Sequence, residues 1–315
     1  MVNRRAALLG GAAVALTAGR ASAQTPAFVT LDVASTANDD ITAALYALHA
    51  DLFKKAGLDV QLRTLTSGSA ISAAVAGGAL DIGRSSMIPL ISARSRGIAF
   101  QLVAPAGLYL ATAPVTALVV PVSSSIKTAS DLAGKVVSVP ALGDLDSVGV
   151  HNWIDANGGD SKATQYVEMP GTAVASELAG GRVAAGTLQN PFLAQALKGG
   201  TVRVLAYHLS SIGPRLLQSS WFATSAFVEK NTAAVRAFAR VMQAASAYCN
   251  THQAQTAELL ATFTKMDPAT VAGMSRVMFA SNLDPAQIQP LIDVAAKYKT
   301  IDKAFDAHEF IAHLS

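Results

Sequence analysis

The chain has 315 residues, of which 51% are hydrophobic and 14% are charged, so it can bury a substantial core in one large domain or two ordinary ones. The formal net charge is only +3, and no cluster of lysine and arginine with interleaved aromatic residues occurs, which argues against nucleic acid as a partner. Cys249 is the single cysteine, which excludes an intrachain disulfide, and we expect it to be a buried core residue.

Residues 1–23 have the pattern of a secretory signal peptide. Arg4 and Arg5 precede an apolar stretch over 6–18, and Ala21-Ser22-Ala23 fits a cleavage site. The apolar stretch is too short to span a bilayer. Loss of this segment, with Arg4, Arg5 and Arg20, would leave 21 basic residues against 21 acidic ones. The pattern predicts export by the general secretory or the twin-arginine route.

The first half of the remaining chain predicts alternating strands and helices. A strand is expected over 28–34, a helix over 41–56 that ends at Gly57, and a second strand over 59–65. A polar loop, Ser35 to Asp40, separates the first strand from its helix.

A short helix and a third strand follow in this half. Gly68 makes a turn, Ser69 is expected to cap the helix, and Gly77-Gly78 is expected to end it in a left-handed conformation. The strand then runs through Leu80 and Ile82. Gly83 is expected to break this strand, so that Arg84, Ser85 and Ser86 can face a ligand.

The second half repeats this order. Residues 171–186 match residues 68–83 at a constant offset of 103, with Gly68 opposite Gly171, Ser69 opposite Thr172, and the double glycine recurring as Gly180-Gly181. A strand over 136–140, a helix to Ala156 and a strand over 165–169 precede this copy.

Each half is therefore predicted to be a β-α-β-α-β unit with parallel strands. In open α/β sheets, ligands bind outside the carboxyl ends of the strands. The loops expected at those ends are polar and rich in Gly, Ser and Asp: residues 35–40, 67–69 and 84–87 in the first half, and 141–147, 170–172 and 188–190 in the second. We expect them to face each other across a cleft.

With these residues in hand, the chain resembles the substrate-binding proteins of nitrate/sulfonate/taurine-type ABC importers, including their thiamine-pyrimidine-binding relatives. The matching stretches are FKKAGLDV at 53–60, GALDIG at 78–83, SDLAGKVVSV at 130–139, AGGRVAA at 179–185, and Pro191. Family members commonly carry Asp where Ala184 or Ala185 stands, so the polar contact is expected to have moved to Gln189 or Asn190.

The resemblance implies an α/β type II periplasmic-binding-protein fold with two lobes joined by a two-strand hinge. The first lobe would be discontinuous, formed by residues 27–113 and 217–315, and the second would span residues 114–216. The hinge crossings are expected near 113–116 and 211–220. The run 232–298 is helical in pattern and would pack on the first lobe.

The candidate ligand-binding residues come from the six loops and their borders. They are Ser35, Thr36, Asn38, Asp39, Ser67, Gly68, Ser69, Arg84, Ser85, Ser86, Asp144, Asp146, Ser147, Gly171, Thr172, Gln189 and Asn190.

The charge of the ligand stays open from the sequence alone. Helix N-termini and Arg84 favour an anion, whereas Asp39, Asp40, Asp144 and Asp146 oppose one, unless they serve as helix caps. A zwitterion or an amine-bearing ring would suit the mixture. Four aromatic residues are candidates for stacking on a ring, with core or hinge packing as the alternative: Tyr46, Tyr109, Tyr207 and Trp221.

The predicted function is that of a periplasmic, monomeric binding protein. It would capture a small polar or aromatic solute, a sulfonate, a carboxylate, or a pyrimidine or amine, and deliver it to a permease with a cytoplasmic ATPase. No cofactor, metal site or catalytic residue is expected: Ser124–Lys127 matches S-x-x-K without the motifs that accompany it, and His308–His313 misses H-E-x-x-H by one residue. The alternatives are a sensor for a membrane receptor and an enzyme similar to thiamine-pyrimidine synthases.

Overall fold

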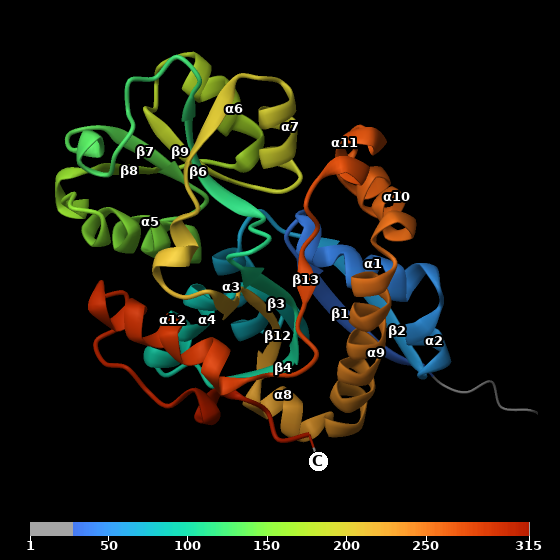
Figure 1. The fold of residues 1–315 in the computed structure, drawn as a ribbon. Coiled ribbons are helices and arrows are strands. Elements are labelled where there is room, and N and C mark those ends of the chain that lie inside the picture. Colours follow the sequence, from blue (N-terminus) through green and yellow to red (C-terminus); the bar gives the residue numbers. More distant parts are fainter. Residues whose placement is uncertain (1–27, 315) are drawn as a thin grey trace, which may run out of the picture.

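The structure is a computed structural model that describes residues 28–314. The signal peptide predicted over residues 1–23 lies outside the described residues. Two separate mixed sheets, each of five strands, carry most of the helices (Figure 1). We call the first sheet with its helices lobe 1, and the second sheet with its helices lobe 2.

The sheet of lobe 1 has the strand order β2-β1-β3-β12-β4. The parallel strands β1 (Val29–Ser35), β2 (Leu58–Thr64) and β3 (Ile82–Ser86) come from the first half of the chain. Strand β12 (Ser219–Thr224) returns from the second half and runs antiparallel between β3 and β4 (Phe100–Pro105).

Helices cover both faces of this sheet. Helices α1 (Thr42–His49), α2 (Leu52–Lys55) and the long α9 (Thr232–Thr251) share one apolar core with β1 and β2. A second core joins α3 (Gly68–Ala76) and α4 (Met87–Ser95) to the opposite face. Lobe 1 is therefore a three-layer structure in which the sheet is buried between helices, as expected for parallel strands.

The sheet of lobe 2 has the order β10-β6-β9-β7-β8. Its strands are β6 (Thr116–Pro121), β7 (Val136–Val139), β8 (Gln165–Glu168), β9 (Ala185–Gln189) and β10 (Val202–Ala206). Its two faces are covered by α5 (Leu145–Ala156) on one side and by α6 (Gly171–Ala179) and α7 (Phe192–Lys198) on the other.

The internal repeat predicted from the sequence is present in the structure. Strands β7, β8 and β9 pair in the same parallel order, β8-β7-β9, as β2-β1-β3 in lobe 1. Helix α6 and strand β9 begin and end 103 residues after α3 and β3. The double glycines end both helices as expected, with Gly78 at φ +75° and Gly181 at φ +69°.

The role predicted for Gly83 is wrong. Strand β3 continues through Gly83 to Ser86. Glycine is required there because a Cβ atom would lie 2.5 Å from Ile71 Cγ2 on α3 and 2.8 Å from the ring of Phe222 on β12. Gly186 meets the equivalent constraint, since its Cβ would lie 2.8 Å from Val174 Cγ1. Both glycines let a helix pack closely on its strand.

The cap predicted for α3 is also displaced by two residues. Ser67, whose Oγ accepts a hydrogen bond from the amide of Ala70 at 3.2 Å, is the N-cap, and Ser69 is the second residue of the helix. Pro170 occupies the corresponding position of α6 and provides no side-chain cap. Ser69 and Thr172 are therefore free for other contacts at these helix N-termini.

The chain passes between the lobes twice. It leaves lobe 1 after β5 (Gly107–Leu110) and enters lobe 2 at β6. It returns through a 3-10 helix (His208–Ser211) and β11 (Arg215–Leu217), which pairs with β5. Four of the remaining elements lie with lobe 1 in Figure 1: α8 (Ser225–Lys230), α10 (Gln253–Thr264), β13 (Met278–Phe279) and α12 (Pro285–Lys297). Helix α11 (Pro268–Gly273) follows α10 and contacts α7 of lobe 2.

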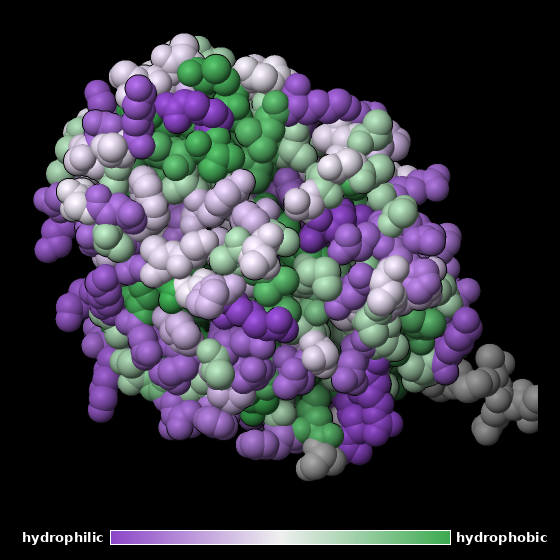
Figure 2. All heavy atoms as spheres, in the orientation of Figure 1, coloured by the Kyte–Doolittle hydropathy of each residue, from purple (hydrophilic) through white to green (hydrophobic). Residues whose placement is uncertain are grey.

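The surface is mixed in character. On the face in Figure 2, hydrophilic residues dominate lobe 1, whereas apolar residues gather over the upper part of lobe 2. Within residues 28–314, no helix has the length and apolar character needed to cross a membrane.

Candidate functional site: the cleft between the lobes

A cavity of about 420 Å³ lies between the two lobes, a volume typical of small-molecule sites. It is bordered by loops that follow the carboxyl ends of β1, β2 and β3 in lobe 1 and of β7, β8 and β9 in lobe 2. The polar turns at residues 67–69 and 170–172 therefore open into one shared space, as the repeat predicts.

The N-termini of α3 and α6 meet in this cleft. Gly68 and Ser69 line it from lobe 1, and Gly171 and Thr172 line it from lobe 2. The first amides of a helix have no partner within the helix, so each terminus presents N–H donors and a partial positive charge of about half an elementary charge. These two helices can hold an acceptor group of a ligand from opposite sides.

Arg84 borders the cleft, but its guanidinium group is committed to the protein. Its side chain is only 2% exposed. Nε donates to Ser35 Oγ at 2.6 Å, Nη1 donates to Asp40 Oδ2 at 2.9 Å, and Nη2 donates to Asn38 Oδ1 at 2.9 Å and to Thr36. Burial lowers the pKa of Arg84, and the charge of Asp40 opposes that shift. Arg84 thus fixes the loop after β1 and has its charge neutralised.

Asp40 completes this buried network from the other side. Its carboxylate also accepts hydrogen bonds from Ser219 Oγ and, at 3.2 Å, from Gln218 Nε2. Ser219 and Gln218 belong to the strand that returns from lobe 2 and to the residue before it. The Arg84–Asp40 pair therefore ties the cleft loop to the second crossing between the lobes.

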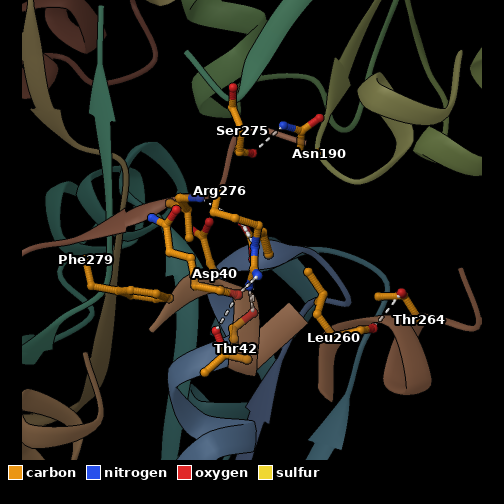
Figure 3. A network of polar contacts seen from close by, with 12 residues as sticks. Asp40, Thr42, Asn190, Leu260, Thr264, Ser275, Arg276 and Phe279 are labelled. Carbon is orange, nitrogen blue, oxygen red and sulfur yellow. Dashed lines mark hydrogen bonds and ion pairs between the residues drawn. The ribbon is translucent and has the colours of Figure 1, made fainter. Parts of the chain in front are cut away.

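Asp39 does not line the cleft and belongs to a polar network with Arg276 and Thr42, both of which are labelled in Figure 3. Arg276 Nε donates to both of its oxygens, at 2.9 and 3.0 Å, and the amide of Val277 donates to Oδ2 at 2.7 Å. Burial raises the pKa of Asp39, and the contacts with Arg276 oppose that shift. Asp39 joins the loop after β1 to the segment between α11 and β13, a structural role.

Two carboxylates from α5 face the cleft in lobe 2. Asp144 caps α5 by accepting from the amide of Ser147 at 2.8 Å. Asp146 Oδ1 accepts from Thr116 Oγ1 at 2.9 Å and lies 2.7 Å from His208 Nε2. Burial, followed by the neighbouring charge of Asp146, raises the pKa of Asp144 well above its usual 3.8.

Direct contacts join the lobes across and beside the cleft. Asn38 Nδ2 donates to Gln189 Oε1 at 2.8 Å across the cleft itself. Asn190 Nδ2 donates to the carbonyl of Ser275 at 2.7 Å, a contact drawn in Figure 3. On the opposite flank, Lys297 Nζ donates to Asn152 Oδ1 at 2.8 Å. The lobes are therefore held in contact on both sides of the cavity.

A comparison with known protein families bears on what this cleft is for. Residues 38–256, well over half of the chain, match the family described as NMT1/THI5 like. The chain belongs to the NMT1/THI5-like family. The match covers both copies of the repeated segment, 68–83 and 171–186, and the second crossing, and it includes the loops that border the cleft except the first residues of the loop after β1. A comparison with curated proteins gave no match.

Solved structures similar to this NMT1/THI5-like chain share its fold. The periplasmic aliphatic sulphonate-binding protein SsuA from Escherichia coli is 20% identical with a TM-score of 0.72, covering 90% of this chain and 97% of its own. The periplasmic nitrate-binding protein NrtA from Synechocystis PCC 6803 is 12% identical with a TM-score of 0.75, covering 90% of this chain and 84% of its own.

A third similar structure is the ligand-binding component of an ABC-type import system from Staphylococcus aureus, 9% identical with a TM-score of 0.77, covering 90% of this chain and 96% of its own. The α/β periplasmic-binding-protein fold expected from the sequence is confirmed by these likenesses. At these identities the likenesses establish the fold and not the role of the chain.

Most of the residues predicted to bind a ligand line the cleft of this NMT1/THI5-like chain. These are Thr36, Asn38, Ser67, Gly68, Ser69, Arg84, Ser86, Asp144, Asp146, Gly171, Thr172 and Gln189.

The other five predicted residues do not line it, for reasons that the contacts make clear. Ser35 accepts from Arg84 beneath the loop, and Asp39 is paired with Arg276. Ser85 is buried under α3, where a Cβ on Gly68 would lie 2.2 Å from its Oγ. Ser147 is buried in the first turn of α5, and Asn190 Oδ1 accepts from the amide of Ala194 in the first turn of α7.

Sequence reasoning missed the apolar and hinge-side walls of the cleft. Phe192 is the aromatic residue among the described lining residues, whereas Tyr46, Tyr109, Tyr207 and Trp221 lie elsewhere. Phe192 directly follows Pro191 and the loop 188–190 that was predicted to face the cleft. That position was the signal that could have identified it. Five other lining residues belong to the loops predicted to face the cleft but were not among the candidate residues: Ala37, Asp40, Ala141, Leu145 and Pro170. The remaining missed residues lie outside those loops: Thr64, Leu65, Thr66, Pro89, Thr116, Pro140, Thr187, Leu209 and Gln218.

Proposed function

We propose that this protein is the extracytoplasmic solute-binding protein of an ABC importer. It captures a small polar or aromatic solute between its lobes and delivers it to a permease in the membrane, which a cytoplasmic ATPase drives. The proteins named above as sulphonate-binding and nitrate-binding, and the ligand-binding component of an import system, support this proposal through their shared fold.

The observation that carries the proposal is the convergence of the two repeats on one cavity. The same turn, Gly68 with Ser69 in one lobe and Gly171 with Thr172 in the other, lines the cavity from opposite walls. A solute that contacts both lobes binds the closed form better than the open form, and it therefore shifts the population toward closure.

The proposed moving parts are the two lobes themselves. Residues 27–113 and 217–315 would act as one body and residues 114–216 as the other, with the two crossings serving as the hinge.

The periplasm is the proposed compartment, and export by the segment 1–23 is the proposed route to it. A single copy of the chain contains both walls of the cleft, which supports a monomer as the binding unit.

The first experiment is a thermal-shift screen of the mature protein against sulfonates, aromatic acids, pyrimidines and amines. A solute that binds only the native state raises the melting temperature. We expect Ser69→Ala to weaken the binding of such a solute several-fold, because one hydrogen bond is worth about 1 kcal/mol. A solute bound with unchanged affinity by this variant would remove Ser69 from the site.

A ligand-sensing partner of a membrane receptor is the second candidate, since it would use the same closure. The neighbouring genes distinguish the two functions. Adjacent permease and ATPase genes favour import, whereas an adjacent receptor kinase favours sensing. Binding to a reconstituted permease, with stimulation of its ATPase by the solute-loaded protein, would then settle the choice.

A further inference from the structure

We infer that the cleft selects a solute carrying a cationic, hydrogen-bond-donating nitrogen group, such as an ammonium or amidinium. This inference rests on the proposed binding function and specifies the charge of the solute. It is carried by the charges and the unpartnered polar atoms that border the cavity.

The charged side chains that line the cleft do not favour an anionic solute. The one basic side chain among its described lining residues is Arg84, whose charge is paired with Asp40 at 2.9 Å and whose guanidinium makes four hydrogen bonds within the protein. Asp144 and Asp146 line the opposite wall without a lysine or arginine partner in the described part of the chain; Asp144 accepts from the amide of Ser147, and Asp146 contacts Thr116 and the imidazole of His208. The cleft is therefore acidic once its internal ion pair is discounted.

Two further side chains that line the cleft have atoms without a partner. Gln218 is 4% exposed, and its amide nitrogen is committed to Asp40 while Oε1 makes no hydrogen bond within residues 28–314. Thr187 is 2% exposed, and its Oγ1 is likewise without a partner in that range. A buried acceptor such as Gln218 Oε1 is costly unless a donor meets it. A solute with N–H groups would provide that donor.

The helix N-termini do not reverse this balance. Those of α3 and α6 each present only a partial charge, and Asp144 already takes up the N-terminus of α5. The termini of α3 and α6 suit an acceptor at the other end of the same solute, such as a ring nitrogen, a carbonyl or a carboxylate.

The apolar part of the wall limits the shape of the solute. Leu65, Pro89, Leu145, Phe192 and Leu209 line the cavity beside these polar groups. A flat or compact hydrocarbon body would be buried against them, with its nitrogen directed to Asp144 and Asp146.

Benzamidine, benzamide and benzoate provide a direct test, because they have nearly the same shape and carry positive, zero and negative charge. Isothermal calorimetry and thermal shift of the mature protein at low salt should rank their affinities as benzamidine, then benzamide, then benzoate. Benzoate binding as tightly as benzamidine, or no stabilisation by millimolar benzamidine, would overturn the inference.

Variants of Asp144 and Asp146 test whether the preference for a cationic solute arises in the cleft. Asp144→Asn keeps a good N-cap and Asp146→Asn keeps an oxygen for Thr116, so both should fold. Each should weaken benzamidine roughly tenfold and change benzamide little, because a hydrogen bond to a charged group contributes more to binding than one between neutral groups. Asp302→Asn, at an exposed site outside the cleft, should change neither. An equal loss of benzamide and benzamidine in the cleft variants would contradict the charge assignment.

Failure of this inference is separable from failure of the proposed function. Native mass spectrometry of the purified protein, together with the broad thermal-shift screen, identifies whatever solute it binds. A bound sulfonate or other anion in the cleft would refute the cationic preference and leave the binding function intact. No bound solute of any charge would refute the binding function itself.

Discussion

At the scale of single residues, the structure contains two kinds of ion pair with very different expected contributions to stability. Arg84–Asp40 is buried, with side chains 2% and 1% exposed, whereas Arg63–Asp32 is 61% and 39% exposed. We expect Arg84→Met to lower the free energy of unfolding by about 3–5 kcal/mol, because it leaves the Asp40 carboxylate buried without its charge partner. Arg63→Met should cost at most about 1 kcal/mol. Urea unfolding checks both, and equal losses would contradict the structural role of Arg84.

The sequence could place Arg84 near the cleft but could not predict its partners. Its four acceptors are Ser35, Thr36, Asn38 and Asp40, which precede it by more than forty residues and reach it only through the pairing of β1 with β3. Asp39 shows the same limit, since Arg276 lies 237 residues away in the sequence. Local pattern identifies a polar loop, and tertiary packing decides which of its side chains face a ligand.

Asp144 gives a pH prediction at the same scale. Its pKa is raised in the folded protein by burial and by Asp146, which itself contacts His208. A carboxyl group with a raised pKa binds more protons in the folded state, so its contribution to stability is lost as pH rises from about 4. Asp144→Asn should therefore be more stable than the ligand-free wild type at neutral pH. The difference should shrink as pH falls toward 4, as thermal unfolding across pH would show. A constant difference would contradict the shift.

At the scale of elements, the repeat predicts matched effects in the two lobes. A Cβ at Gly83 or Gly186 would lie within 2.8 Å of a side chain on α3 or α6, so each alanine variant should lose about 1–3 kcal/mol through overpacking. Gly273 in α11 is the control, because nothing lies within 4 Å of its Cβ position. Its alanine variant should be neutral or slightly stabilised. Comparable stabilities for all three variants, measured by thermal unfolding, would contradict the packing argument.

The elements of the repeat were the part of the fold most accessible from sequence. The double glycines fix the ends of α3 and α6, and Ile82 marks the start of β3, although that strand continues past the break expected at Gly83. Sequence could not reveal that β12 inserts between β3 and β4, because an antiparallel strand from the distant half has no local signature. The close packing that requires Gly83 depends in part on Phe222 of that inserted strand.

At the scale of the whole molecule, contacts between the lobes outside the cleft should bias the protein toward closure. Lys198 Nζ lies 3.0 Å from Asp267 on one flank, and Lys297 donates to Asn152 on the other. The double variant Lys198→Met, Lys297→Met should open the ligand-free protein and weaken solute affinity by no more than roughly tenfold, since exposed contacts of this kind are individually weak.

Small-angle X-ray scattering should detect the opening as a larger radius of gyration. Lys54→Met, which removes an exposed ion pair with Asp51 within lobe 1, should change neither the radius nor the affinity. An unchanged radius in the double variant would show that these contacts do not control closure.

The central claim is that one small solute is clasped between the two halves of the repeat. A crystal structure of the protein with a solute identified by thermal shift tests it most directly. The account predicts solute density between the turns at 67–69 and 170–172, in contact with both lobes and with its nitrogen toward Asp144 and Asp146. A solute bound to one lobe alone, or outside the cleft, would contradict it.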